Sequence, residues 1–222
     1  MPISRRCGVL FDLDGTLADT AQDLAYALNQ TLLAWDRPVM PFERIRPRVS
    51  HGGRALIDLG FGLGPGDADY DAIRHDLLAC YQANLARHTR LFPGMTALLE
   101  ALDQRGIVWG IVTNKPAWLT DPLMQALPMP RAPDCVVSGD TTLHAKPHPE
   151  PIFYACRQLG ILPADCWVVG DAERDIQAGL AAGTRTLVAL FGYLDEQDQP
   201  DCWGADGGIK TPGELLDWLD RG

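Results

Sequence analysis

The feature that most constrains the fold is a short apolar run that ends in two acids. Residues 7–11, Cys-Gly-Val-Leu-Phe, are long enough for a strand buried on both faces, and Asp12 and Asp14 follow it. Because carboxylates do not belong inside a buried strand, we expect them at its carboxyl end, where ligands collect in open α/β sheets. Side chains alternate along an extended chain, so Asp12 and Asp14 point the same way. Gly15 then permits a sharp turn or a close approach to the backbone.

Two carboxylates on one edge repel each other, and a hard cation relieves the repulsion. Mg²⁺ takes oxygen ligands, usually one or two protein carboxylates with substrate phosphate and water. A carboxylate can also attack a phosphoryl group to give an aspartyl-phosphate. The pattern therefore indicates an Asp nucleophile beside an acid/base Asp on a magnesium site. The plainer alternative is a strand followed by a solvated Asp-Gly turn.

Predicted strands and helices alternate from residue 107 onward. We expect strands at 107–113, 135–138, 166–170 and 185–190. We expect helices at 116–127 and 149–159, then one that ends near 182 and a terminal one around 215–219. This alternation implies a parallel sheet with right-handed crossovers, so the predicted fold class is α/β with a Rossmann-like core.

A helical block interrupts this pattern after the first strand. Between residues 16 and 89 we predict no strand, and apolar periodicity indicates helices at 19–35, up to 59 and at 67–87. We interpret residues 17–88 as an inserted all-helical cap domain. The catalytic core domain would then comprise residues 1–16 and 89–222.

Polar side chains mark three further strand ends. Thr113 ends the second core strand, where its hydroxyl and nearby backbone N–H groups can hold phosphate oxygens. Lys146 precedes a helix and can neutralise a phosphoryl group, while Asp171 and Asp175 can both face a metal, with Asp171 the better ligand. Singly, each has a plain alternative: a satisfied turn, an exposed lysine, or a helix start enriched in acids. Together at strand ends they indicate a phosphoryl-transfer site.

Composition excludes several other functions. The net charge of −10 argues against a general nucleic-acid binder, and no apolar run approaches the ~20 residues that span a bilayer. The first residues contain no signal-peptide apolar region, and the six cysteines form no Cys-x-x-Cys pair. We therefore expect a cytoplasmic protein that binds a small molecule, with no nucleic acid or membrane partner. The expected oligomeric state is a monomer or a homodimer.

Four motifs resemble those of the haloacid dehalogenase-like hydrolases, specifically phosphatases with a helical cap after the first strand. They are Asp-Leu-Asp-Gly-Thr at 12–16, Thr-Asn-Lys-Pro at 113–116, Lys-Pro-His-Pro-Glu-Pro at 146–151 and Gly-Asp-(x)₃-Asp at 170–175. The resemblance covers essentially the whole chain. It implies a Mg²⁺-dependent phosphomonoester hydrolase that works through an aspartyl-phosphate.

The resemblance also implies roles for the four acids. Asp12 would be the nucleophile and a metal ligand. Asp14 would be the general acid/base and would give its main-chain carbonyl to the metal. Asp171 would complete the metal ligands, and Asp175, counted with the metal residues, would act through water or through contacts with the ligands.

The remaining implied roles belong to the phosphoryl group and the cap. Thr113 and Asn114 would bind the transferring phosphoryl group, and Lys146 would orient and neutralise it. On the cap, His51 and Arg54 are our candidates for substrate specificity, because arginine suits bidentate recognition of a carboxylate. A solvated arginine after a glycine turn is the alternative for Arg54.

Within the superfamily, the chain resembles two phosphatase branches. The Thr-Asn-Lys-Pro and Lys-Pro-His-Pro forms are similar to phosphoglycolate phosphatases. Residues 109–116, 182–186 and 203–206 are similar to N-acetylmuramic acid 6-phosphate phosphatases. Both substrates carry a carboxylate beside the phosphate, and the sequence does not separate them.

Three other classes share part of the pattern. A phosphosugar mutase of the β-phosphoglucomutase type would share all four motifs and the cap, and only its products would differ. A dehalogenase would need neither the acid at Asp14 nor a magnesium cluster. A non-enzymatic phospho-accepting switch would lack the cap and would have no use for Asp14.

Overall fold

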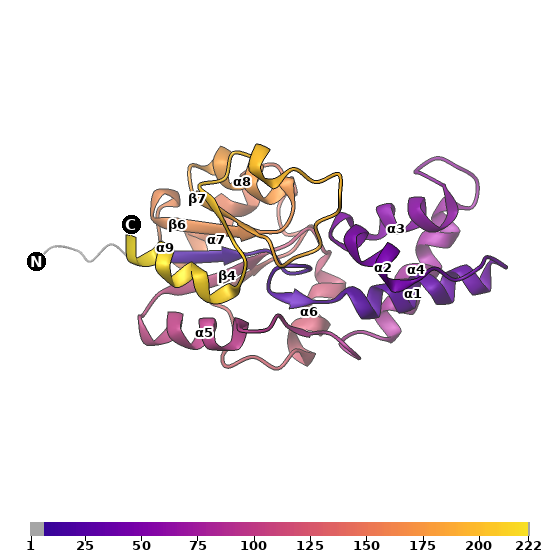
Figure 1. Ribbon diagram of the computed structural model, residues 1–222, viewed down its shortest axis with the longest axis horizontal. Helices are drawn as coiled ribbons and strands as arrows, with labels where there is room; N and C mark the ends of the chain where they lie inside the picture. Colours follow the sequence, from indigo (N-terminus) through magenta and orange to yellow (C-terminus); the bar gives the residue numbers. More distant parts are fainter. Residues whose placement is uncertain (1–6, 222) are drawn as a thin grey trace, which may run out of the picture.

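The computed structural model describes residues 7–221, which form an α/β half and a helical half (Figure 1). The α/β half is built on a six-stranded sheet with the order β5-β4-β1-β6-β7-β8. Its strands are β1 (Gly8–Phe11), β4 (Val108–Val112), β5 (Cys135–Val137), β6 (Cys166–Gly170), β7 (Arg185–Ala189) and β8 (Gly207–Ile209). Every pairing is parallel, which confirms the predicted sheet.

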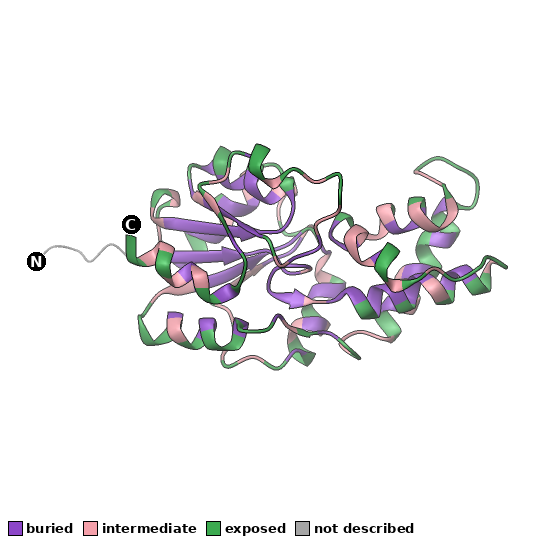
Figure 2. Cartoon of the chain, in the orientation of Figure 1, coloured by how far each residue is buried: buried purple, intermediate pink, exposed green. Residues whose placement is uncertain are grey.

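The first strand lies at the centre of the sheet. β1 pairs with β4 on one side and β6 on the other, so Phe11 is level with Ile111 and Val169. All four residues of β1 are buried, as expected for a strand covered on both faces (Figure 2). The chain that leaves β1 therefore emerges between the carboxyl ends of two neighbouring strands.

Helices cover both faces of the sheet. The core helices are α5 (Met95–Gln104), α6 (Ala117–Ala126), α7 (Glu150–Leu159), α8 (Glu173–Ala182) and α9 (Leu215–Arg221), with short 3₁₀ turns at Pro163–Asp165, Pro200–Cys202 and Pro212–Glu214. Val9 and Phe11 share an apolar cluster with residues of α5, α6 and α9. Leu10 points to the opposite face and joins residues of α7 and α8. This alternation along β1 produces the three-layer arrangement.

The helical half lies beyond the carboxyl ends of the strands (Figure 1). It contains α1 (Ala21–Ala34), α2 (Phe42–Ile45), the 3₁₀ helix η1 (Arg46–His51), α3 (Gly52–Phe61) and α4 (Tyr70–Ala83). Leu28, Ile57 and Leu77 are fully or almost fully buried in an apolar cluster that this half builds largely from its own side chains. The domain boundaries at 16/17 and 88/89 stay a prediction.

A small antiparallel pair joins the two halves. β2 (Ala18–Asp19) pairs with β3 (Arg90–Leu91) where the chain enters and leaves the helical half. The prediction that no strand lies between residues 16 and 89 is therefore wrong at β2. Two residues are too short to show a periodic pattern, and their pairing depends on a partner distant in the sequence.

The carboxyl-terminal region adds one more strand that the sequence pattern did not indicate. β8 pairs with β7 at the edge of the sheet through a Gly-Gly-Ile stretch, which has little of the β-branched character typical of strands. Between them, residues 192–206 contact the helical half, since Arg48 and Asp195 form an ion pair at 3.2 Å. In residues 7–221, no helix combines the length and apolarity needed to cross a membrane.

Candidate active site

Three predicted acids converge at the carboxyl edge of the sheet. Asp12 directly follows β1, Asp171 directly follows β6, and Asp175 lies in the first turn of α8. All three are buried, and one carboxylate oxygen of each lies within 4.8 Å of the others. Adjacent parallel strands end at one edge, which explains how acids so far apart in the sequence meet.

Burial and nearby negative charge raise the pKa of two of these acids. Burial, followed by the charges of Asp12 and Asp175, raises the pKa of Asp171 to about 7. Burial also raises the pKa of Asp12, although Lys146 opposes the shift. A divalent cation would relieve the repulsion among these carboxylates, and carboxylate oxygens are ligands that Mg²⁺ prefers. The donor set therefore fits the predicted metal.

Lys146 is buried among these acids rather than exposed on the surface. Its side chain is 2% exposed, and its ammonium group lies 2.7 Å from Asp12 Oδ1 and 2.8 Å from Asp175 Oδ1. It also donates to the carbonyl of Val112 at 2.5 Å. Burial alone would lower the pKa of Lys146, but the two aspartates raise it, so the lysine stays protonated.

Asn114 holds the backbone of Lys146 in place. Its Oδ1 accepts the Lys146 backbone N–H at 3.0 Å, and its Nδ2 donates to the Lys146 carbonyl at 2.8 Å. Both ends of the amide are therefore occupied by the loop that carries the lysine. Thr113 is buried beside it, and its hydroxyl accepts the Lys115 backbone N–H at 3.2 Å.

The turn after β1 brings the backbone against Asp171. Gly15 has φ of 96°, and a Cβ atom there would lie 2.1 Å from Asp171 Oδ2. Both roles expected of this glycine, a sharp turn and a close approach, are therefore present. Thr16 donates to Asp171 Oδ1 at 3.1 Å, and the backbone N–H of Tyr193 donates to Oδ2 at 2.9 Å. Asp171 is fixed from two separate loops.

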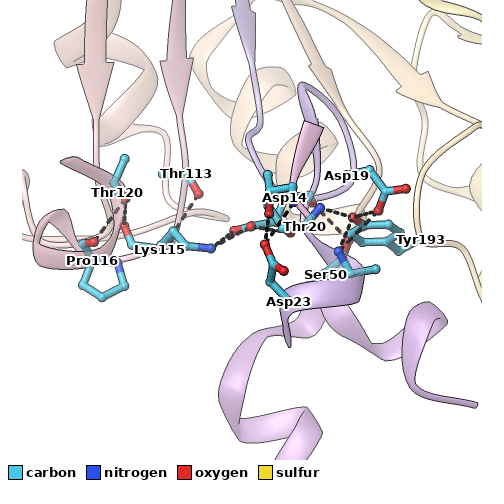
Figure 3. Close-up of polar contacts among 12 residues, drawn as sticks. Asp14, Asp19, Thr20, Asp23, Ser50, Thr113, Lys115, Pro116, Thr120 and Tyr193 are labelled. Carbon is cyan, nitrogen blue, oxygen red and sulfur yellow. Dashed lines mark hydrogen bonds and ion pairs between the residues drawn. The ribbon is translucent and has the colours of Figure 1, made fainter. Parts of the chain in front are cut away.

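Asp14 is paired with a lysine that sequence reasoning left without a role. Lys115 Nζ lies 2.6 and 2.8 Å from the two carboxylate oxygens of Asp14, and Thr20 donates to Oδ1 at 2.7 Å (Figure 3). The ammonium group also lies 4.8 Å from the ring centre of Tyr81, which belongs to α4. The available signal was the position of Lys115, directly after Thr-Asn at a strand end.

The helical half reaches the cluster mainly through Ser50 of η1. The Ser50 hydroxyl donates to Asp171 Oδ2 at 2.5 Å and lies 3.4 Å from the carbonyl of Asp14. Its own carbonyl accepts a hydrogen bond from Arg174 of α8. Sequence reasoning assigned nothing to Ser50 or Arg174, because both contacts join segments that are distant in the sequence.

Tyr193 ties the loop after β7 to the junction between the halves. Its hydroxyl donates to Asp19 Oδ1 at 2.6 Å and accepts the backbone N–H groups of Thr20 and Ala21 at 2.6 and 3.0 Å (Figure 3). The role of residues 192–206, which the sequence left open, is therefore in part to brace the start of α1 against the acid cluster.

A cavity of about 380 Å³ opens between the two halves. Its core side is lined by Asp12, Asp14, Thr113, Asn114, Lys115 and Arg174, and its helical side includes Ser50, His51, Arg54, Arg74 and Tyr81. Burial, and then the nearby charge of Arg174, lowers the pKa of His51. The predicted catalytic acids and the predicted specificity residues thus line one cavity from opposite sides.

Known proteins resemble this chain in sequence or in structure. The family described as haloacid dehalogenase-like hydrolase matches residues 9–189. An N-acetylmuramic acid 6-phosphate phosphatase of Pseudomonas aeruginosa is 40% identical, over 96% of this chain and 94% of its own. A phosphoglycolate phosphatase of Xanthomonas campestris is 39% identical, over 93% of each chain. A crystal structure from Haemophilus somnus, described as a predicted phosphoglycolate phosphatase, shares the fold with a TM-score of 0.85 at 24% identity, covering 98% of this chain and 99% of that one.

Proposed function

Since this chain belongs to the haloacid dehalogenase-like hydrolases, we propose that it is a phosphatase that cleaves a small phosphorylated carboxylic acid. The two candidate substrates are N-acetylmuramic acid 6-phosphate and 2-phosphoglycolate, which give their names to the relatives at 40% and 39% identity. The observation that carries the proposal is the pairing of Asp12 with Lys146 and of Asp14 with Lys115, with both aspartates lining one cavity.

In the first step, Asp12 attacks the phosphorus atom. A new bond forms between its carboxylate oxygen and phosphorus, and the ester bond to the leaving oxygen breaks. Asp14 gives a proton to that oxygen, which leaves as an alcohol. Lys146, 2.7 Å from Asp12 Oδ1, orients the carboxylate and offsets the charge of the phosphoryl oxygens. Thr113 and the backbone after β4 bind those oxygens.

In the second step, water removes the phosphoryl group from Asp12. Asp14 accepts a proton from the water, whose oxygen bonds to phosphorus while the acyl-phosphate bond breaks, which frees phosphate and regenerates Asp12. Lys115 is a positioning residue here, because it holds the Asp14 carboxylate toward the cavity. Asn114 acts likewise by holding the backbone of Lys146.

Asp12, Asp171 and the carbonyl of Asp14 would hold Mg²⁺, with Asp175 nearby. The bound ion would supply positive charge to the phosphoryl oxygens. The burial of Asp12, Asp171 and Asp175 supports this assignment, since a crowded set of buried carboxylates needs a counter-charge.

The helical half would act as a cap over the substrate. Arg54 and His51 line the cavity from α3 and η1, and we propose that Arg54 pairs with the substrate carboxylate. Closure of this half over the core would exclude bulk water from the aspartyl-phosphate. A cytoplasmic location, and a monomer or homodimer, stay predictions.

The test is release of inorganic phosphate by the wild-type protein with Mg²⁺ or with a chelator. We expect Mg²⁺-dependent release from one of the two carboxylic acid phosphates, and loss of that release in Asp12→Asn. Asp217→Asn, which changes an exposed acid of α9, is the matched control. Conversion of glucose 1-phosphate into glucose 6-phosphate would instead identify a mutase. Phosphorylation of Asp12 without turnover would identify a phospho-accepting switch.

A further inference from the structure

A second hollow lies beside the cavity, between α4 and α6. This hollow is about 390 Å³ in volume and is lined by Trp118 of α6 and by one face of α4. Arg74 and Leu78 line both the cavity over Asp12 and this hollow, so the two spaces adjoin. Ligand pockets for drug-sized molecules measure about 300–1,000 Å³. The two adjoining spaces together have room for a ligand larger than a two-carbon phosphate ester.

Trp118 is the aromatic side chain that lines this hollow. Its side chain is 43% exposed although it belongs to a helix that packs on the sheet. An indole offers a broad, rigid apolar face with negative potential, which suits the C–H face of a sugar ring. Across the hollow, α4 presents polar side chains from Asp71, His75 and Gln82, which can hydrogen-bond hydroxyl or amide substituents.

Arg74 supplies a cation at the junction of the two spaces. Within residues 7–221, no carboxylate lies close enough to Arg74 to form an ion pair. Its guanidinium group is therefore available to the oxygen substituents of a ligand that extends outward from Asp12.

We propose that the hollow between α4 and α6 is a subsite for a pyranose ring, with Trp118 as its stacking face and Arg74 as its polar contact. This inference rests on the proposed phosphatase function and narrows its substrate. In this proposal the ring of a hexose 6-phosphate extends from the cavity into the hollow, whereas 2-phosphoglycolate has no ring to place there. The specificity of the site then comes from both halves of the molecule, because Trp118 belongs to the core and Arg74 to the helical half.

The experiment compares Trp118→Ala, Trp118→Phe and Arg74→Gln on N-acetylmuramic acid 6-phosphate and on 2-phosphoglycolate. We expect Trp118→Ala to lower kcat/KM for the sugar phosphate by about tenfold, mainly through KM, and to leave phosphoglycolate turnover within about twofold. Trp118→Phe should retain most of the activity. Arg74→Gln should lower kcat/KM for the sugar phosphate and leave kcat/KM for phosphoglycolate nearly unchanged. Phe153→Ala, which removes an exposed aromatic ring of α7, is the matched control and should change kcat/KM for neither substrate.

Each contrary result has a distinct meaning. Equal losses on both substrates, or no loss on either, would overturn the subsite while leaving the phosphatase function intact. If the wild-type protein hydrolyses neither substrate, the proposed function fails, and calorimetry on Asp12→Asn then tests the subsite alone. In that measurement, a sugar phosphate that binds no more tightly than phosphoglycolate would overturn the proposal.

Discussion

Two aspartates that are two residues apart are each paired with a lysine, and the two pairs differ in their surroundings. Lys146 and Asp12 are 2% and 5% exposed, and Lys146 also contacts Asp175, so that pair is almost fully buried. Lys115 and Asp14 are 6% and 16% exposed, and they lie at the cavity beneath Tyr81 of the helical half. Both aspartates line the cavity, but Lys146 lies behind Asp12 inside the core, whereas Lys115 itself lines the cavity beside Asp14.

This difference separates two requirements of the proposed chemistry. A nucleophile needs a fixed position and a constant counter-charge, which a fully buried lysine provides. A group that must give and take a proton needs access to substrate and water, which the Asp14 side chain has. The contact of Tyr81 with Lys115 also makes the second pair sensitive to the position of the helical half.

The largest effect is expected from breaking the buried pair with Lys146→Met. Loss of the ammonium group would leave Asp12 and Asp175 as uncompensated buried charges, at a cost of about 3–5 kcal/mol in the free energy of unfolding. Urea denaturation measures this cost, and phosphate release should be abolished as well. Lys210→Met, at an exposed lysine, is the control. A stability change below about 1 kcal/mol would show that Lys146 is not the main counter-charge of the cluster.

The next largest effect is expected from Lys115→Met. Because Asp14 can be hydrated through the cavity, we expect a smaller stability loss than for Lys146→Met, but a fall in kcat of about 10²-fold with little change in KM. A pH–rate profile of kcat should change shape, since Lys115 contacts the acid/base residue directly. An unaltered profile with unchanged kcat would contradict the positioning role.

A moderate effect on thermal stability is expected from the addition of Mg²⁺. The proposed Mg²⁺ would bind only the folded cluster and would offset the repulsion among its carboxylates, so its addition should raise the Tm. At a concentration hundredfold above the Kd, the gain is about 2.7 kcal/mol, or on the order of 5–10 °C for a chain of this size. Differential scanning calorimetry checks this, with sodium chloride at matched ionic strength as the control. An equal shift in Asp171→Asn would mean that the ion binds elsewhere.

The smallest effect is expected from an ion pair near the surface. The side chains of Arg48 and Asp195 are 31% and 15% exposed, so their attraction is screened by solvent. Arg48→Gln should therefore cost at most about 1 kcal/mol in the free energy of unfolding, measured by urea denaturation. A cost equal to that of Lys146→Met would show that burial does not explain the difference between the pairs.

The parts that could be predicted from the sequence are those set by local pattern and strand order. The apolar runs at β1, β4, β6 and β7 locate the sheet, and the rule that parallel strands end at one edge brings Asp12, Asp171, Asp175 and Lys146 together. Thr113 and Asn114 follow from the same rule. The hydrogen bonds between the Asn114 amide and the Lys146 backbone do not follow from this rule, because they depend on how two loops pack together.

The parts that the sequence did not reveal depend on contacts between distant segments. Lys115 looks like any surface lysine until Asp14 and Tyr81 enclose it. Tyr193 lies in a loop without periodicity, and its hydroxyl contacts appear only after the helical half is placed. β8 contains two glycines, and its pairing is decided by the strand beside it.

The pairing of β2 with β3 has a consequence for how such proteins diversify. Because Ala18 pairs with Leu91 and Asp19 with Arg90, the two points at which the helical half joins the core are neighbours. A segment whose ends are already adjacent can be lengthened, shortened or exchanged without moving the strands on either side. Evolution can thus replace the helical half, which we propose to set substrate specificity, and keep the acid cluster of the core. A protein engineer could graft a different helical segment at these two points.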